Sequence, residues 1–287
     1  AVKTALKIMG FKVVDGYDLE SFVSEQRKQM DTKLPMSKWM SVAGWAQKVA
    51  EQFIYNHTSA LEKMEGDYKL DESEQEIKDS IIQSRADALE KELKYIIFGV
   101  TVRHTLDNEI FYDYRYEYKE LYDLRGFVSD PKIFEMLPGE SLKAWVKRAV
   151  VEFRCKLTNE ALESFGWILG DYDLKSFESR QAIIDSKNSK ELKPYTWSRL
   201  QVVALLRELV KKELEKLGFD GDIESVLNGI ETETRDDSRT ITFSSDGAPK
   251  GDYSISEKKE TKILVKDWTR IYAENMFKYF ENKKNQY

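Results

Sequence analysis

Apolar residues recur with helical spacing in two stretches, one in each half of the chain. The first stretch follows Ser37 and the second follows Thr196, whose hydroxyl groups are typical of helix N-caps. Positions three or four residues apart share one face of a helix, so both stretches are predicted to be amphipathic helices that begin at these caps. Their apolar positions are Met40, Ala43, Val49 and Phe53 in the first, and Leu200, Val203, Leu206 and Val210 in the second.

Three further helices and a shorter one follow from the same spacing. An acidic segment at 71–93 places Ile77, Ile81, Ala86 and Leu89 on one face, and a shorter counterpart lies near 223–230. Each half is predicted to close with a tryptophan-containing helix, at 142–157 in the first half and at 265–280 in the second.

Between these helices the period changes to that of β-strands. Residues 95–105 and 110–120 flank a turn at Asp107-Asn108, and tyrosines alternate with charged residues along the second run. This predicts a β-hairpin at about 95–120, and a turn-rich segment at 246–251 predicts a second one at about 239–265. The fold class is therefore α+β and predominantly helical. The alternating tyrosines, which we call the tyrosine ladder, are Tyr112, Tyr114, Tyr116 and Tyr118.

Four short blocks occur in the same order in both halves. The most specific is Tyr17-Asp18-Leu19-x-Ser21-Phe22, which recurs as Tyr172-Asp173-Leu174-x-Ser176-Phe177. Such an ordered set indicates an internal duplication. We therefore predict two tandem related units, 1–155 and 156–287, each with several helices, a β-hairpin and a closing helix. The other pairs of blocks begin at Ala5 and Ala161, at Pro35 and Pro194, and at Leu61 and Leu214, which matches Trp39 with Trp197 and, in the closing helices, Trp145 with Trp268.

Composition supports a globular intracellular protein. The 287 residues are 41% apolar and 33% charged, and only 5 are proline and 14 glycine, which favours helices over loop-rich folds. The longest apolar run, at about 95–102, is far shorter than the roughly 20 residues of a membrane helix. The first residues lack the apolar core of a signal peptide, so the protein is expected to stay inside the cell or to have lost a targeting segment already. We therefore expect no membrane association and a reducing, cytoplasmic location, in which the single Cys155 forms no intrachain disulfide.

Acidic and basic residues are evenly distributed. The first 155 residues hold 23 basic and 27 acidic side chains, and the rest hold 22 and 24, so neither half is a polycation. This disfavours a protein that coats duplex nucleic acid through counterion release, although a local basic groove remains compatible with it.

Motifs of catalysis are sparse. One cysteine and two histidines are too few for a zinc cluster, and the glycine-rich nucleotide loops, the hydrolase elbow and the zinc-protease motif do not occur in the sequence. We expect no cofactor or metal, and we favour a non-enzyme. The remaining enzymatic pattern is Glu117-x-Lys119, with Asp107 as an additional acid, which is typical of metal-dependent nucleases. A similar pair, Glu257-x-Lys259, lies in the second predicted hairpin.

The tyrosine ladder and the repeated Tyr-Asp pair are the candidate binding residues. The ladder, with Arg115, fits a strand packed on its own helices, a protein interface or a stacking surface for single-stranded nucleic acid. The acids Asp113 and Glu117 weigh against a phosphate-binding strip. The pairs Tyr17-Asp18 and Tyr172-Asp173 form either a docking surface used twice or structural turns in which the aspartates cap helices.

These observations favour a non-catalytic macromolecular binding or assembly protein that acts as a tandem pseudo-dimer, with another protein or a second copy as its partner. Its lysine-rich, tyrosine-rich and glycine-poor composition is common in viral and phage proteins. The alternatives are a single-stranded nucleic-acid-binding protein and the metal-dependent nuclease. The nucleic-acid alternative would use the hairpin faces and a basic cluster of Lys143, Lys147, Arg148 and Arg154.

Overall fold

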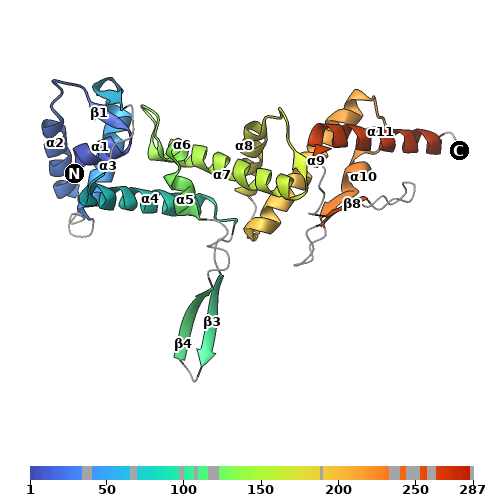
Figure 1. The fold of residues 1–287 in the computed structure, drawn as a ribbon, viewed down its shortest axis with the longest axis horizontal. Coiled ribbons are helices and arrows are strands. Elements are labelled where there is room, and N and C mark those ends of the chain that lie inside the picture. The colour runs from blue at the N-terminus through green and yellow to red at the C-terminus, as the bar shows by residue number, and fades with distance from the viewer. Residues whose placement is uncertain are drawn as a thin grey trace. The chain divides into compact units, whose positions relative to one another are not determined.

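The structure is a computed structural model. It describes residues 1–33, 41–64, 70–96, 100–106, 109–115, 123–187, 190–232, 240–243, 253–256 and 263–284. Helices make up most of the described chain, and the strands form small sheets of two or three strands (Figure 1). The chain divides into two compact units. The first unit is 1–94 with 99–152, and the second is 95–98 with 153–287.

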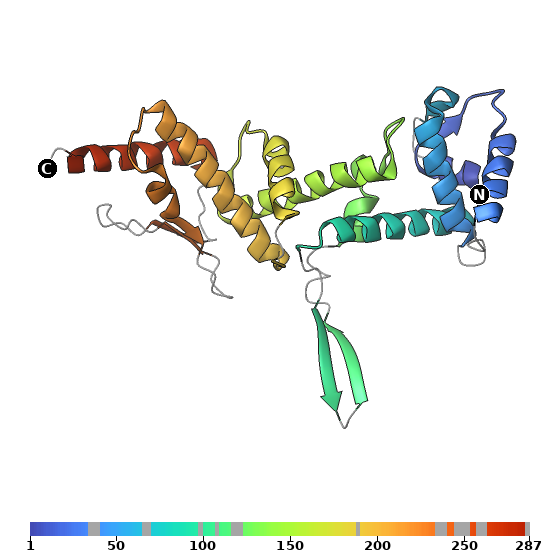
Figure 2. The same cartoon turned by 180° about the vertical axis from the view of Figure 1, so that it is seen from behind.

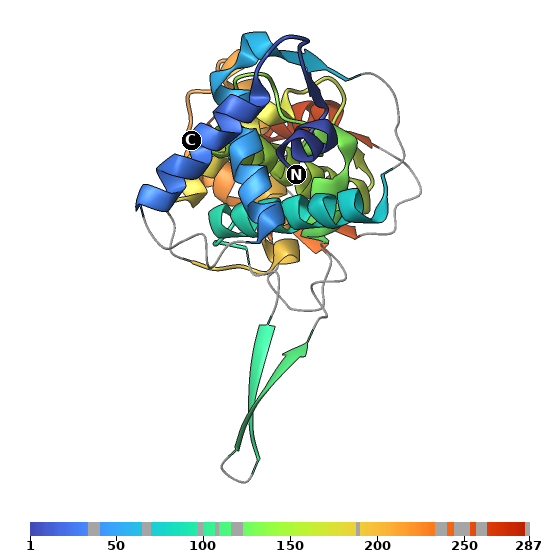
Figure 3. The same cartoon turned by 90° about the vertical axis from the view of Figure 1, so that its left-hand side faces the viewer.

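The first unit is built around three helices that contact one another. Helix α1 packs against α3 and α4, which also contact each other (Figure 3). Strand β1 pairs antiparallel with β2, with Phe11 opposite Lys63. The elements of this unit are α1 (Val2–Ile8), β1 (Phe11–Val13), α2 (Leu19–Lys33), α3 (Val42–Asn56), a 3-10 turn (Thr58–Ala60), β2 (Leu61–Lys63), α4 (Glu72–Glu92), β3 (Val100–Leu106), β4 (Glu109–Arg115), α5 (Leu124–Ser129), α6 (Pro131–Phe134) and the first part of α7 (Leu142–Ser164).

Helix α4 confirms the prediction for 71–93. Asp71 is its N-cap and accepts a hydrogen bond from the Glu74 backbone amide at 2.8 Å, while the Glu74 carboxylate accepts one from the Asp71 amide at 3.3 Å. This reciprocal capping box satisfies amides that the helix itself leaves unpaired. The buried face includes Ile81, Ala86 and Leu89, as the apolar spacing predicted.

Helix α4 also buries an arginine at the centre of the first unit. The Arg85 side chain is fully buried, and its guanidinium carbon lies 4.7 Å from the Phe134 ring centroid and 4.9 Å from that of Trp145. Its Nη1 donates to the Phe134 carbonyl oxygen. The nearest carboxylate, that of Glu51, is 4.0 Å from Nε.

The predicted helix starts are partly wrong. Ser41 caps α3 and accepts from the Gly44 amide at 3.1 Å, whereas Ser37 and Trp39 lie outside the described residues. Helix α9 (Pro194–Lys216) begins before Thr196, with Lys193 as its N-cap. The fixed φ of proline suits the first helical turn, where no amide donor is needed. Pro194 therefore extends this helix past the predicted cap.

The second unit continues from the middle of α7. Helices α9 and α11 pack against each other (Figure 2). Strands β6, β7 and β8 form an antiparallel sheet, while β5 pairs with β9 in parallel. Its further elements are β5 (Trp167–Ile168), α8 (Leu174–Asp185), α9, α10 (Ile223–Asn228), β6 (Ile230–Thr232), β7 (Thr240–Phe243), β8 (Tyr253–Ser256), β9 (Ile263–Leu264) and α11 (Val265–Lys284).

Strands β3 and β4 pair on either side of the predicted turn at 107–108, from Leu106 opposite Glu109 to Val100 opposite Arg115. The first strand begins at Val100 and not at Tyr95 as predicted. Tyr95 and Ile96 belong to the second unit, where the Leu192 amide donates to the Tyr95 carbonyl at 3.0 Å. In the second predicted hairpin, β7 and β8 pair as expected, but β6 adds a third strand and 263–264 forms the separate strand β9.

The two units differ in several elements that the predicted duplication would make alike. Strand β1 has an antiparallel partner, whereas β5 has a parallel one. Trp145 is fully buried and donates to the Ile133 carbonyl at 2.8 Å, while Trp268 is half-buried and stacks on Tyr272. The predicted boundary at 155 lies within α7, as does the division between the units at 152 and 153.

Candidate functional site

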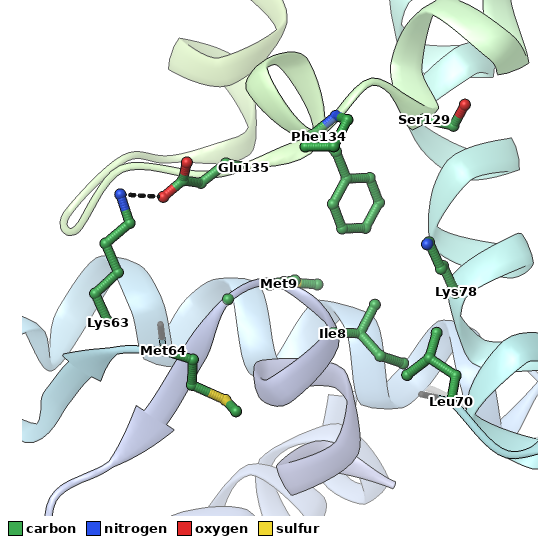
Figure 4. Close-up of a pocket in the computed structure, with 11 residues that line it drawn as sticks. Ile8, Met9, Lys63, Met64, Leu70, Lys78, Ser129, Phe134 and Glu135 are labelled. Carbon is green, nitrogen blue, oxygen red and sulfur yellow. Dashed lines mark ion pairs between the residues drawn. The ribbon is translucent and has the colours of Figure 1, made fainter. Parts of the chain in front are cut away.

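A cavity of about 300 Å³ lies within the first unit between α1, β2, α4 and the segment of α5 and α6 (Figure 4). Its apolar wall is formed by Ile8, Met9, Leu70 and Phe134, among others. The Phe134 ring points into the space (Figure 4). This volume is at the lower end of the range for small-molecule pockets, roughly 300–1,000 Å³.

Charged groups border this cavity on two sides. Lys63 Nζ and a Glu135 carboxylate oxygen form an ion pair of 2.6 Å on one side, and Lys78 and Ser129 lie on another (Figure 4). Such a lining can bind an apolar group and orient a polar end. The residues that line it come from separate elements without a common sequence spacing, so sequence analysis missed this cavity.

A second hollow, of about 460 Å³, lies beside Tyr17, and we call it the Tyr17 site. The Tyr17 hydroxyl shares a hydrogen bond of 3.2 Å with His57 Nδ1. The Phe22 ring lies 5.0 Å from the His57 ring, and Phe53 packs beneath at 5.3 Å from Tyr17, measured between ring centroids. The hollow is lined by Tyr17, Asp18, Ser21, Phe22, Glu25, Gln26, Asn56 and His57.

The backbone before α2 positions the Tyr17 side chain. The chain turns out of α1 at Gly10, whose φ of 90° is in the left-handed region that favours glycine. Asp18 accepts a hydrogen bond from the Ser21 amide at 2.9 Å, which fixes the start of α2. Asp18 thus caps the helix, as expected if the Tyr-Asp pair is a structural turn. Its side chain is also exposed to solvent.

The segment before α8 shares two local features with the segment before α2. Gly166 has a φ of 74°, and Asp173 is the N-cap of α8 and accepts from the Ser176 amide at 3.0 Å. Phe177 is fully buried, whereas its counterpart Phe22 is half-buried. The repeated block therefore places an aspartate that accepts from the serine amide at the start of a helix in both units.

Around Tyr172 the contacts are ionic, and we call this group the Tyr172 site. The Tyr172 hydroxyl donates to Glu208 at 3.0 Å, and the same carboxylate accepts from Arg180 at 2.9 Å and from Lys212 at 2.7 Å. Lys212 Nζ also lies 5.7 Å from the Tyr172 ring centroid. The site is therefore filled by cations of the chain itself.

The pKa values at the Tyr172 site follow from this packing. Burial, together with the adjacent Glu208 carboxylate, raises the pKa of Tyr172 to about 12. Burial opposes ionisation of Glu208, but hydrogen bonds from Lys212, Arg180 and Tyr172 outweigh it and lower the pKa of Glu208. The carboxylate is thus ionised and the phenol neutral at physiological pH.

The Tyr17 and Tyr172 sites are related by one constant separation. Each tyrosine contacts two residues four positions apart, which are Phe53 in α3 and His57 at its C-cap, or Glu208 and Lys212 in α9. All three pairs of positions, 17 and 172, 53 and 208, and 57 and 212, are 155 residues apart. The sequence blocks had suggested other offsets for these helices. Applying the 155-residue offset of the Tyr-Asp block to the helices that follow would have identified these pairs of positions from the sequence.

The tyrosine ladder is only partly within the described residues. Tyr112 and Tyr114 lie on β4, opposite Arg103 and Thr101 of β3, and Arg115 ends β4 opposite Val100. Their side chains are not among those described. The residues Tyr116, Tyr118, Asp107, Glu117, Lys119, Glu257 and Lys259 lie outside the described residues, so both the ladder and the nuclease pattern stay predictions.

The basic cluster on α7 is not a uniformly exposed patch. Lys143 and Lys147 are exposed, but Arg148 donates to the Glu140 carboxylate at 2.9 Å and to the Glu135 carbonyl at 2.7 Å. Arg154 is fully buried. Two of the four cations are therefore already paired within the protein, because their side chains lie on the inner faces of the helix.

Arg154 is the centre of a buried ion network in the second unit. Its guanidinium donates to Glu178 and Asp185 at 2.9 Å each and to the Tyr95 hydroxyl at 2.7 Å. Burial raises the pKa of Glu178, whose other oxygen accepts from Thr158 at 2.7 Å. This network joins α7, α8 and residue 95, and no sequence motif marks it.

No protein-family model, curated protein or solved structure matches this chain. Within the described ranges, no group of three or more histidine, cysteine, aspartate or glutamate residues is placed to hold a metal ion. In the same part of the chain, no helix has the length and apolar character required to span a membrane.

Proposed function

We propose that this chain is a non-catalytic binding or assembly protein in which two tandem related units present diverged forms of one surface, the Tyr17 site and the Tyr172 site. The observation that carries the proposal is the repeated contact of a tyrosine with two residues four positions apart, in α3 and at its C-cap or in α9, at a constant separation of 155 residues. Chance similarity between helical segments does not explain a shared contact pattern as well as a duplication does.

The framework behind the two sites supports this relation. Leu6 and Leu162 are both buried, and Phe11 and Trp167, on the short strands that follow, are buried as well. A glycine in the left-handed region precedes each strand. Residues that support the backbone are therefore alike, although the strand pairing differs between the units.

The surface residues have diverged in charge, which suits two different contacts. Positions 18, 25, 53, 56 and 57 carry two negative charges and no lysine or arginine. The positions 155 residues later, 173, 180, 208, 211 and 212, carry three positive and two negative charges. A chain with two distinct surfaces can bridge two partners or join copies of itself head to tail. The proposal includes a reducing cytoplasmic setting, for which the single buried Cys155 provides support.

The test is the association state of the purified full chain. Sedimentation velocity over a wide concentration range, with chemical cross-linking, is expected to show self-association or a defined complex with a protein co-purified from the native source. In parallel, labelled single strands are titrated at low and high salt. A chain that stays monomeric and unpartnered but binds single strands with a steep salt dependence would overturn the proposal in favour of nucleic-acid binding.

A further inference from the structure

We propose that the Tyr17 site binds a basic side chain, lysine or arginine, presented by a partner protein. This inference rests on the proposed function and specifies the chemistry of one of its two surfaces. It is carried by the comparison of an open site in the first unit with a self-filled one in the second.

Aromatic faces around the hollow provide the first element of such a site. The rings of Tyr17, Phe22 and His57 are all half-buried and line the same hollow, with centroid separations of 5.7 Å between Tyr17 and His57 and 5.0 Å between Phe22 and His57. The face of an aromatic ring attracts a cation because its π electrons concentrate negative charge there. A lysine or arginine stem can also pack its methylenes on these rings.

Two carboxylates provide the complementary charge. Asp18 and Glu25 are exposed and line the hollow with the rings. Within the described residues, neither forms an ion pair. Asp18 accepts a hydrogen bond from the Ser21 amide, and its side chain is exposed to solvent. A cation in the hollow would thus meet aromatic faces and unpaired carboxylates together.

The second unit shows what fills the equivalent place. Lys212 lies against the Tyr172 ring at 5.7 Å, and Arg180 Nη2 donates to both Glu208 carboxylate oxygens, at 2.9 and 3.0 Å. The positions 155 residues earlier hold His57 and Glu25. The first unit therefore has an acid where the second has an arginine, and a histidine where the second has the lysine that lies against the tyrosine. A cation for the Tyr17 site is thus expected to come from another molecule.

The dimensions favour a side chain over a free ammonium ion. The hollow, at about 460 Å³, is much larger than a single ammonium group and is also lined by the polar Gln26 and Asn56, which can pair with a peptide backbone. A single exposed cation–π contact contributes only about 0.5–1 kcal/mol, too little to hold a free ion. A partner protein would bind at this site because its backbone and the methylene groups of its basic side chain add further contacts.

The experiment is an NMR titration of the isotope-labelled full chain with three probes. Two are capped peptides, Ser-Lys-Ser and Ser-Gln-Ser, which differ only in the central side chain, and the third is methylammonium chloride. The lysine peptide is expected to shift the amide signals of Tyr17, Phe22 and His57, and the glutamine peptide is not. An equal response to methylammonium would overturn the proposal in favour of a small ammonium ligand.

Three variants and one matched control test the assignment. Glu25→Gln and Phe22→Leu are each expected to lower the affinity for the lysine peptide by roughly two- to fivefold. Glu25→Arg, which places the second unit's residue type in the first, is expected to abolish the response because the chain then fills its own site. Glu163→Gln removes an exposed acid of the second unit and should leave binding unchanged. Unfolding midpoints confirm that each variant is folded.

The outcomes separate this inference from the proposed function. Shifts of equal size with both peptides, or unchanged binding in Glu25→Arg, would overturn the inference, while self-association of the chain would still stand. A monomeric chain that nevertheless responds to the lysine peptide at Tyr17 would support the inference and count against assembly.

Discussion

Each unit buries an arginine against a tryptophan ring, Arg85 in the first and Arg154 in the second, and these two arginines differ in how many hydrogen-bond partners they have. Arg154 lies 4.7 Å from the Trp197 ring centroid and reaches two carboxylates and a phenol at 2.7–2.9 Å. Arg85 lies 4.9 Å from that of Trp145, but within the described residues its Nε and Nη2 have no hydrogen-bond partner. Burial lowers the pKa of Arg85 to about 10, so it still carries its charge at neutral pH.

The contrast shows what makes a buried charge useful to a fold. A fully hydrogen-bonded network fixes how the elements that it joins are arranged. In a partly hydrogen-bonded network, the free-energy cost of removing the charge from water is not offset by new hydrogen bonds. We therefore expect the Arg154 network to be a strong constraint on the second unit. We expect the Arg85 side chain to be stabilised more by its contacts with the Phe134 and Trp145 rings than by ion pairing.

The largest effect is expected for Trp197→Ala. The change leaves a cavity and removes the indole donor to Asp185 at 3.1 Å, so the free energy of unfolding should fall by about 4–5 kcal/mol. Urea unfolding followed by circular dichroism measures this. A change within experimental error would mean that the tryptophan does not contribute to the core. The same prediction for Trp39 cannot be argued from contacts, because that residue lies outside the described range.

The second-largest loss of stability is expected for Arg154→Met. Removal of the guanidinium leaves Glu178 and Asp185 without their common partner, and we expect a loss of about 3–5 kcal/mol in the free energy of unfolding. The matched change in the other unit is Arg85→Met combined with Glu51→Gln, which removes a poorly paired charge couple. That double variant should lie within about 1 kcal/mol of the parent or be more stable. Equal losses of unfolding free energy in Arg154→Met and in the Arg85→Met, Glu51→Gln double variant would show that the two arginines contribute alike to stability.

A smaller effect concerns pH and Glu51 alone. Burial raises the pKa of Glu51, although hydrogen bonding by Gln47 and the charge of Arg85 oppose the shift. The folded state then binds this proton more tightly than the unfolded chain, so stability falls as pH rises through the interval between the unfolded and the folded pKa. Glu51→Gln should remove that part of the pH dependence. Unfolding midpoints at mildly acidic and neutral pH, compared between parent and variant, provide the measurement.

The smallest effect on stability is expected for the tyrosine ladder. If these tyrosines face a partner, Tyr114→Ser with Tyr116→Ser should weaken the complex and leave the unfolding midpoint nearly unchanged. Sedimentation and thermal unfolding of the same samples decide this. A large loss of stability would assign the ladder to the protein's own core.

Local features of the fold were predictable, and long-range ones were not. Both ends of α4 and the starts of α7 and α11 follow from local sequence features, whereas α7 and α11 continue past the predicted ends at 157 and 280 to Ser164 and Lys284. Strands β5 and β9 have two residues each, too few to show a period, so their parallel pairing left no trace in the sequence. The Arg154 network joins residues 95, 154, 178 and 185, and single residues so far apart carry no pattern.

The candidate sites divide in the same way. The Tyr-Asp block was visible because similar sequences occur in both halves, and in both places the aspartate accepts from the serine amide three residues later. The contacts with His57 and Lys212 required knowledge of which helix turns face the tyrosines. The cavity of Figure 4 gathers residues from 8 to 135, and only folding brings them together.

The position of Tyr95 has a consequence for the order in which the chain folds. This residue is synthesised within the sequence of the first unit, yet its hydroxyl completes the hydrogen bonds of Arg154, and Gln201 lies 3.4 Å from the same guanidinium. The Arg154 network is thus assembled from discontinuous pieces, and it is complete only after Gln201, more than a hundred residues beyond Tyr95, has left the ribosome. Such closure of distant contacts slows folding. The nascent first half must therefore keep Tyr95 available, and a protein cut after residue 152 would release a second half without its own phenol.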